Sequence, residues 1–377
     1  MKLFKSLMLL LLAIVLSTIV YLLFKHDIQA SHDTPYTRAD VIQVEAPATE
    51  PRWRLLLLGD AGDSTLTPWH PTLALASELA SIEPEKTSVV MLGDNIYLAG
   101  YPNLDEDETE FDEDQLELID RLNAQLQISK RSGAELFLVP GNHDWYATQV
   151  DSQAEHVVRY AKKHQAKVQF MPWQKGTTPA PSAVHRDGVS IIFLDTQWLI
   201  TTDQSGLDKG LAQLTQLISD IERDHPDNLM LVTGHHPLQT MGPHAEFYTS
   251  RGYALVMGLI SLFVDMDQDI TNPPYQRLIT GLNKALSTSS KVIYAAGHEH
   301  SLQLFEGLNT GPDYQIVSGA ANDSKVSGVG HNEHSLFAVS QEGLTQLSLY
   351  PEGLLLEAIA TEGGKVLHRQ WLWHTAP

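Results

Sequence analysis

Five apolar runs, each followed by a glycine and then by Asp, Asn or His, constrain this sequence most strongly. The runs end in GDAG, GDNIY, GNHD, GHHP and GHEH and occupy 54–58, 88–92, 134–139, 228–233 and 291–296. Short apolar runs bounded by turn residues predict buried β-strands. Asp195 follows a sixth run, 189–194. Helical patterns lie between the runs, at 71–82, 115–131, 152–164 and 207–224. Strands that alternate with helices predict an α/β core.

The C-terminal part of the chain follows a different pattern. Four short apolar runs succeed one another there with only brief breaks, at 334–340, 344–350, 353–360 and 366–373. Short strands at such close spacing predict an antiparallel meander.

The N-terminus has the features of a membrane anchor. Lys2 and Lys5 precede the uncharged, mostly apolar residues 6–24, and Lys25 follows them. At about 1.5 Å per residue this helix would just span a hydrocarbon core of about 30 Å. A secretory signal usually has a shorter apolar region, and Ile28–Ala30 is a poor cleavage site. We therefore favour a single-pass anchor over residues 1–25, with the positive-inside rule placing the rest of the chain outside the cytoplasm, in the periplasm or at the cell surface.

Composition excludes several other classes of protein. The chain has no cysteine, which excludes disulfides, thiolate metal sites and cysteine nucleophiles. Its formal net charge of −21 opposes binding to nucleic acid. Residues 26–52 are polar and contain three prolines, so they are expected to link the anchor to a folded domain over 53–375.

Two stretches interrupt the strand and helix pattern. Residues 105–114 hold eight acidic side chains in ten positions, and we expect a solvated loop or the start of a helix. Residues 253–266 are apolar but too short to span a bilayer, which indicates a core helix or a hydrophobic insertion.

The polar residues after the strands indicate a metal site. In α/β sheets, ligands bind at the carboxyl ends of the strands. One Gly-Asp or Gly-Asn pair is an ordinary turn, but five endings that all carry metal-binding side chains are not explained by turns alone. Hard oxygen donors mixed with imidazole suit Fe, Mn or Zn better than Ca or Mg. The donors exceed the needs of one tetrahedral ion, so we expect two ions that share a carboxylate.

In their order and spacing these motifs resemble the calcineurin-like metallophosphoesterases, and among them the purple acid phosphatases of the tartrate-resistant type. The resemblance runs from Arg54 to about Lys325 and includes FLDTQ (193–197) and YQIVSGAAN (314–322). Most metallophosphoesterases carry Asp-x-His in the first motif, which here reads Asp60-Ala61-Gly62. Purple acid phosphatases use the tyrosine of GDNIY instead. The resemblance implies a four-layer α/β/β/α sandwich in which the C-terminal meander completes the second sheet.

The resemblance also implies a ligand set for two metal ions. The first ion, Fe(III), would be held by Asp60, Tyr97 and His300, the second ion, Fe, Zn or Mn, by Asn142, His235 and His298, and Asp94 would bridge them. A phenolate from Tyr97 suits a trivalent ion and implies a coloured iron centre. The two histidines of GHEH would then bind different ions.

The implied reaction is the attack of a metal-bound hydroxide on a phosphomonoester, as in an acid phosphatase. His143 would neutralise the transition state or protonate the leaving group, Asp144 would orient it, and His236 is a second catalytic candidate. Trp145 and Tyr146 would line a substrate pocket or pack in the core. The substrate would be a phosphorylated small molecule or a phosphoprotein.

Two alternatives remain open at this point. The same metal core would serve a phosphodiesterase or a pyrophosphatase, because specificity lies in the surrounding loops. A protein of another class, a non-catalytic surface-binding protein on the same scaffold, is the second alternative. The sequence leaves the oligomeric state undetermined.

Overall fold

The computed structural model describes residues 32–103, 110–146, 150–244, 268–307, 310–322, 324 and 326–374. The expected anchor at 1–25 and the apolar stretch at 253–266 lie outside these residues, as do 105–109 of the acidic stretch. Within the described ranges, none of the helices combines the length and the apolar character needed to cross a bilayer.

One sheet contains the first three predicted strands. β2 (Trp53–Leu58), β3 (Thr87–Met91), β4 (Glu135–Leu138) and β5 (Val168–Phe170) pair in parallel in that order. The antiparallel meander β13 (Gly343–Tyr350), β14 (Gly353–Ala360) and β15 (Val366–His374) extends the sheet beyond β2. The carboxyl ends of β2, β3 and β4 therefore lie at one edge, next to one another.

The second sheet contains the predicted strands at 189–194, 228–233, 291–296 and 334–340. Its order is β1 (Tyr36–Thr37), β12 (Ser335–Val339), β10 (Leu302–Glu306), β11 (Tyr314–Ser318), β9 (Val292–Ala296), β8 (Leu229–Thr233), β7 (Val189–Phe193) and β6 (Ser182–Arg186). β7, β8, β9 and β11 are mutually parallel, and the other pairs are antiparallel. The motifs that follow β8 and β9 thus also meet at one edge.

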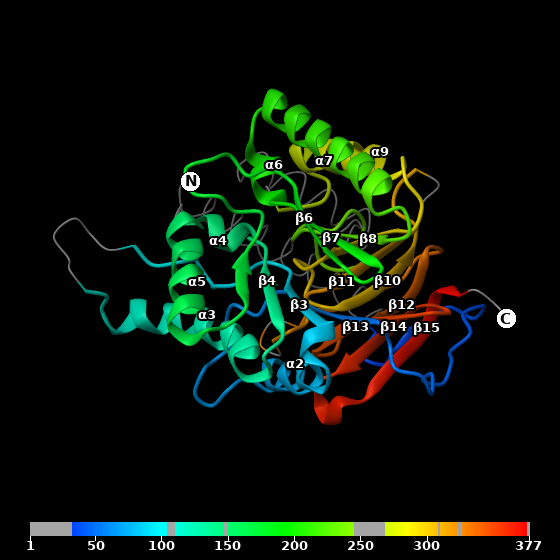
Figure 1. Cartoon of the computed structure of the whole chain (residues 1–377), viewed down its shortest axis with the longest axis horizontal. Helices are drawn as coiled ribbons and strands as arrows, with labels where there is room; N and C mark the ends of the chain where they lie inside the picture. The colour runs from blue at the N-terminus through cyan, green and yellow to red at the C-terminus, as the bar shows by residue number, and fades with distance from the viewer. Residues whose placement is uncertain are drawn as a thin grey trace, which may run out of the picture.

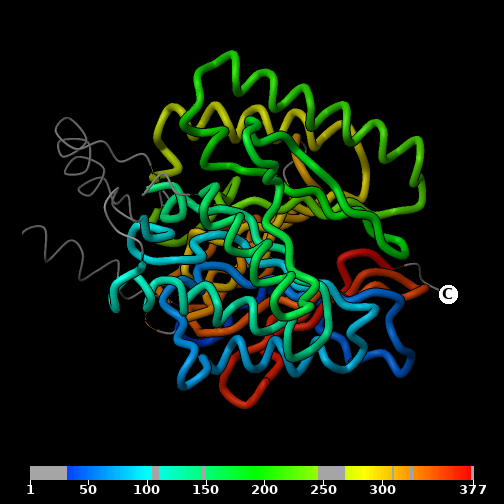
Figure 2. The backbone as a smooth tube through the Cα atoms, turned by 60° about the vertical axis from the view of Figure 1, so that its left-hand side comes forward, coloured from blue at the N-terminus to red at the C-terminus, as the bar shows by residue number. Residues whose placement is uncertain are grey.

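Helices cover the outer face of each sheet, which gives four layers (Figures 1 and 2). α2 (Pro71–Ile82), α3 (Glu113–Ser132) and α5 (Val150–His164) pack on the sheet of β2. α6 (Thr196–Thr201), α7 (Gln204–Asp224) and α9 (Pro273–Leu286) pack on the other sheet. The short elements α4 (Asn142–Tyr146), η2 (Pro84–Lys86) and η5 (Glu362–Gly364) complete the described helices.

The uninterrupted apolar runs are explained by these layers. Leu55 and Leu57 of β2 face the second sheet, whereas Leu56 and Leu58 face the helices. Successive side chains of a strand point to opposite faces, so a strand covered on both faces must be apolar at every position. The expected α/β/β/α sandwich is confirmed.

The last residues of the acidic stretch form the start of helix α3, which was one of the two expectations for this stretch. The side chain of Asp112 accepts a hydrogen bond from the backbone of Gln115, and the Gln115 side chain accepts one from the backbone of Asp112. This reciprocal capping box satisfies amides that the first turn of α3 would otherwise leave unpaired.

The C-terminal strands differ from the expectation. β13, β14 and β15 do form a meander, but they extend the sheet of β2 and do not complete the opposite one. β12 belongs to the other sheet, between β1 and β10. The pairing of β13 with β2 places Leu347 in the core between the sheets, a long-range contact that strand spacing does not encode.

Part of the expected linker also lies on the domain. Tyr36 and Thr37 form β1 and pair with Ala338 and Phe337 of β12. The guanidinium of Arg38 donates to both carboxylate oxygens of Glu306, at 2.6 and 2.9 Å. A two-residue strand is too short to show the alternation that identifies a strand in sequence.

Candidate metal centre

The carboxyl ends of strands from both sheets meet at one place. The amide of Gly59, after β2, donates to the carbonyl of Ser318, the last residue of β11, at 2.7 Å. The His235 ring, after β8, contacts the carbonyl of Leu92, after β3, with Nδ1 at 2.8 Å from the oxygen. The amide of His298, after β9, donates to Oδ2 of Asp60 at 2.8 Å. These bonds join the two sheets through the predicted ligand motifs.

One group of donors consists of Asp60, Tyr97 and His300. The Tyr97 hydroxyl donates to Oδ1 of Asp60 at 3.0 Å and lies 3.2 Å from Nε2 of His300. The same imidazole nitrogen is 3.4 Å from Oδ1 of Asp60. The structure therefore brings together the three residues predicted to hold the first ion.

A second group consists of Asn142, His235 and His298. Nε2 of His235 lies 2.9 Å from Oδ1 of Asn142 and 3.3 Å from Nδ1 of His298. Oδ1 of Asp94 is 3.4 Å from the same nitrogen of His235. One donor atom each from Asp60, Asp94 and His235 lie within 4.8 Å of one another, so Asp94 stands where the two groups meet.

The backbone is strained at three of these residues. Asp60, Asp94 and His298 have φ angles of 63°, 53° and 69°, in the left-handed region. For a residue other than glycine this conformation costs about 1–2 kcal/mol, and such outliers concentrate at functional sites. The local chain thus adopts an unfavourable conformation in order to direct these side chains to a common point.

Glycine is required where the loops approach one another. A Cβ on Gly141 would lie 2.2 Å from Oδ1 of Asp94, and one on Gly93 would lie 2.5 Å from Nδ1 of His235. Gly93 also has a φ of 91°. The glycines of GDNIY and GNHD therefore leave the space that the ligand side chains occupy.

The charges in this centre call for a cation. Asp60 and Asp94 are buried, and in the described part of the chain their ion-pair partners are histidines, with no lysine or arginine among them. Burial, together with Asp60 and Asp94, raises the pKa of Tyr97 well above its ordinary value. Burial and the neighbouring histidines lower the pKa of His298 well below its ordinary value. Buried carboxylates beside imidazoles and a phenol form a donor set that fits metal ions.

His143 lies at the open side of this centre. Its side chain is 24% exposed, and its Nε2 is 3.9 Å from Oδ2 of Asp94. Its Nδ1 contacts the carbonyl oxygen of Leu98. A carbonyl only accepts hydrogen bonds, so Nδ1 carries the proton and Nε2 faces the centre.

Asp144 has other partners than the one expected for it. Its carboxylate is fully buried and accepts hydrogen bonds from Gly141, Asn95 and Gln153; within the described part of the chain, its hydrogen bonds do not involve the His143 ring. Burial, with the charge of Asp94, raises the pKa of Asp144 to about 6. Asp144 holds the loops after β3 and β4 together and acts on His143 only through the backbone of α4.

His236 is completely buried beside His235 and His298. Its Nδ1 is 2.8 Å from Oγ1 of Thr196, and its Nε2 is 3.1 Å from Oε1 of Gln268. A ring with both nitrogens occupied and no exposed surface is poorly placed to touch a substrate. It could instead provide a further donor, since a nitrogen of each of these three histidines falls within 4.8 Å of the others.

Two residues near the centre were not predicted from the sequence. The ring of His244 stacks on His298 with centroids 4.5 Å apart. Glu299 is fully buried, accepts a hydrogen bond from the His244 amide at 2.9 Å, and has its pKa raised by burial to about 8. His244 follows no apolar run and so lacks the signal that identified the other residues. In the sequence, Glu299 lies between the predicted ligands His298 and His300, and this position is the signal that could have identified it.

Comparisons with known proteins identify a family and similar folds. A family model for calcineurin-like phosphoesterases matches residues 54–302. GAP50, described as the anchor in the inner membrane complex of Plasmodium, aligns at 16% identity and a TM-score of 0.51, over 87% of this chain and 90% of that chain. The phosphopantetheinyl hydrolase PptH from Mycobacterium tuberculosis aligns at 11% identity and a TM-score of 0.37, over 72% of this chain and 91% of that chain. No curated protein matches the chain.

The match to the family model covers most of the chain and includes every residue of the two donor groups and Asp94. The chain belongs to the calcineurin-like phosphoesterase family.

Proposed function

We propose that this protein is a phosphomonoesterase of the purple acid phosphatase type with two metal ions. The observation that carries the proposal is the pair of donor groups on either side of Asp94. One contains a tyrosine with a carboxylate and an imidazole, and the other contains an amide with two imidazoles. The first donor set suits Fe(III), and the second suits Fe, Zn or Mn.

The residues of the chain divide the work of phosphoester hydrolysis. Bound cations would polarise the phosphoryl group and lower the pKa of water. Asp94 would fix the two donor groups relative to each other, since its carboxylate is close to His235 and to the backbone amide of His143. With its ring doubly protonated, His143 would give the proton on Nε2 to the ester oxygen as the phosphorus–oxygen bond breaks and would keep the proton on Nδ1, while water would supply the new oxygen on phosphorus.

Two alternatives to a phosphomonoesterase are a different phosphoester hydrolase and a non-catalytic protein. A phosphodiesterase or pyrophosphatase would need the same donors and would differ only in the loops around them. The Plasmodium protein of similar fold is described as an anchor, which is the observation in favour of a non-catalytic second candidate. The complete donor set in this chain supports catalysis over that candidate.

We also propose that residues 1–25 attach the domain to a membrane, outside the cytoplasm. The length of the apolar run and the lysines before it support this proposal. A fusion of the full chain to a reporter that is active only outside the cytoplasm tests it. Recovery of the reporter in the soluble cytoplasmic fraction would refute it.

Metal analysis and a substrate panel on the full chain test the catalytic proposal. We expect two equivalents of metal and faster turnover of a monoester than of a diester or a nucleoside diphosphate. Asp94→Asn should lower kcat/KM by roughly 100-fold or more, because it removes a charged donor from the centre. Asp120→Asn changes an exposed carboxylate on α3 and serves as the control. Equal activity of Asp94→Asn and the parent would rule out the dinuclear mechanism, and inactivity of the metal-loaded parent on every ester would favour the non-catalytic candidate.

A further inference from the structure

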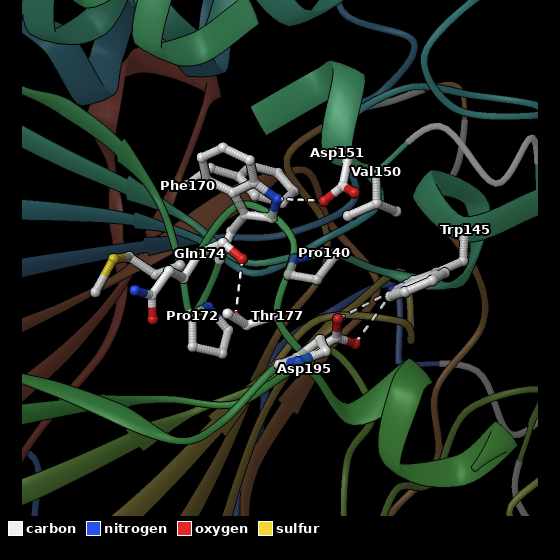
Figure 3. Close-up of a pocket in the computed structure, with 12 residues that line it drawn as sticks. Pro140, Trp145, Val150, Asp151, Phe170, Pro172, Gln174, Thr177 and Asp195 are labelled. Atoms are coloured by element: carbon white, nitrogen blue, oxygen red, sulfur yellow. Dashed lines mark hydrogen bonds between the residues drawn. The ribbon is translucent and has the colours of Figure 1, made fainter. Parts of the chain in front are cut away.

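A pocket of about 130 Å³ lies beside the metal centre, at the carboxyl ends of β4, β5 and β7 (Figure 3). Half of its twelve wall residues are aromatic residues or prolines, and two carry carboxyl groups; the walls include Pro140, Trp145, Phe170, Trp173, Asp151 and Asp195. In Figure 3, Trp145 and Asp195 lie together at one end, and Phe170 lies across the pocket from them. None of the functions assigned above uses this pocket.

The pocket and the metal centre share two structural elements. Trp145 follows Asn142 by three positions on α4, which places their Cβ atoms roughly 5–6 Å apart on one side of the helix. Asp195 immediately precedes Thr196, whose hydroxyl accepts a hydrogen bond from the amide of His235 at 3.1 Å. A ligand a few bonds long could therefore place one end at the metal centre and the other in the pocket.

The charged side chains in the described walls of the pocket are both acidic. Asp195 is only 4% exposed, and its carboxylate accepts hydrogen bonds from the indole of Trp145 at 3.2 Å and from the amide of Trp198 at 2.9 Å. Across the described residues, Asp195 has no ion pair with a lysine, arginine or histidine, and the described walls of the pocket contain none of these residues. Burial raises the pKa of Asp195 to about 7, so the carboxyl group is partly protonated near neutral pH, and a cation bound beside it would favour the charged form.

Helix capping explains the hydrogen bonds of Asp195 but not the open space. Asp195 is the N-cap of α6, which accounts for its bond to Trp198. The volume in front of it is close to the 150 Å³ of an engineered cavity that takes up benzene. A trimethylammonium group or a single ring would fit, whereas a nucleobase with its sugar would not.

We propose that this pocket binds the compact organic cation of a phosphomonoester substrate, an alkylammonium or trimethylammonium group, while the phosphate lies at the metal centre. The proposal rests on the proposed phosphatase function and names its substrate class. Aromatic rings attract such cations through their π faces, and a desolvated carboxylate adds to the attraction. A neutral apolar group would gain from the rings alone.

Two esters that differ by one charge test the proposal. Choline phosphate and 3,3-dimethylbutyl phosphate have the same shape, because a carbon atom replaces the nitrogen. With the metal-loaded full chain, we expect kcat/KM to be about tenfold higher for choline phosphate. Asp195→Asn should bring this ratio close to one, because asparagine keeps the capping oxygen and loses the charge.

Asp203→Asn is the matched control, since Asp203 caps α7 through the amide of Gly206 and does not line the pocket. It should keep the parent ratio. Trp145→Leu is a second variant, in case Asp195→Asn does not fold, and it should also lower the ratio by removing a ring from the pocket.

Direct binding separates this inference from the proposed function. Tetramethylammonium carries no phosphate, so calorimetry with the metal-free chain reports on the pocket alone, and we expect binding that Asp195→Asn abolishes. Equal hydrolysis of both esters, or a preference for the neutral one, would overturn the inference and leave the phosphatase function intact. Binding of tetramethylammonium without hydrolysis of either ester would support the pocket and overturn the phosphatase function.

Discussion

The exchange Asp144→Asn probes the buried carboxylate that joins the loops of the metal centre. Oδ2 of Asp144 accepts from Gly141 at 2.7 Å and from the Asn95 side chain at 2.9 Å, whereas Oδ1 accepts from the Gln153 side chain at 2.9 Å. Oε1 of Gln153 is buried and accepts no hydrogen bond from the described residues. Asparagine can keep its oxygen toward Gly141 and Asn95, and Gln153 can rotate its amide to accept from the new NH₂ group. We therefore expect Asp144→Asn to fold.

The magnitude of the effect follows from proton linkage. The pKa of Asp144 is raised from 3.8 to about 6, mainly because burial disfavours the charged form. Folding thus favours the protonated carboxyl, so this group stabilises the fold below pH 3.8 and loses that contribution as the pH rises through 6. The full loss is about 3 kcal/mol, of which about 1.4 kcal/mol falls between pH 5 and pH 8. An asparagine has no such dependence.

Urea denaturation of the parent and of Asp144→Asn in EDTA, at pH 5 and pH 8, measures this difference. The parent should lose about 1.4 kcal/mol of stability through this group from pH 5 to pH 8, and the variant should not. The free energy of unfolding of the variant minus that of the parent should therefore rise by about 1.4 kcal/mol from pH 5 to pH 8. Carboxylates that do not interact with Asp144 cancel in the comparison, whereas Asp94 and Asp195 interact with its charge. Asp144→Ala should be less stable than Asp144→Asn by about 3 kcal/mol or more at pH 5, because several buried donors lose their acceptor. Parallel pH profiles for variant and parent would refute the reasoning, and so would an alanine variant as stable as the asparagine variant.

Three further predictions concern the residues around the metal centre. Tyr97→Phe should remove the visible absorption band of the iron-loaded protein; absence of that band in the parent would refute Fe(III) at this position and favour Zn or Mn. His143→Asn should lower kcat by roughly 100-fold while metal content stays at the parent value, because the exchange removes the proton donor; loss of metal in this variant would assign His143 to binding. Tyr146→Phe removes the hydroxyl that accepts from the Asn142 side chain at 2.8 Å. It should weaken the affinity for one of the two ions about tenfold and be rescued by excess metal; titration curves identical to those of the parent would show that Tyr146 does not orient Asn142.

The strands, the main helices and the donor motifs could be predicted from the sequence because their signals are local. The apolar pattern at 71–82 coincides with α2, and the run at 54–58 with all but the first residue of β2. Glycine followed by a polar residue directly identified the ends of β2, β8 and β9. His244 could not be found in this way, since its position beside His298 depends on a bond to Glu299 and not on a strand before it.

Sheet partners and the pocket depend on contacts between distant parts of the chain. The pairing of β13 with β2 joins segments almost 290 residues apart, and no local pattern distinguishes it from a place in the opposite sheet. The sequence left Trp145 with two explanations, a substrate pocket or core packing, and marked Asp195 only as the residue after an apolar run. Only the packing of α4 against the start of α6 brings the indole to the carboxylate, at 3.2 Å.

The sequence by itself determined which residues would form buried strands, where those strands would stop and which donors would follow them, because side-chain alternation and turn chemistry act over a few residues. The tertiary structure alone decided which strands became neighbours and where the chain left an acidic aromatic pocket. Those features depend on how two sheets pack against each other, and packing energies arise between residues that the sequence keeps far apart.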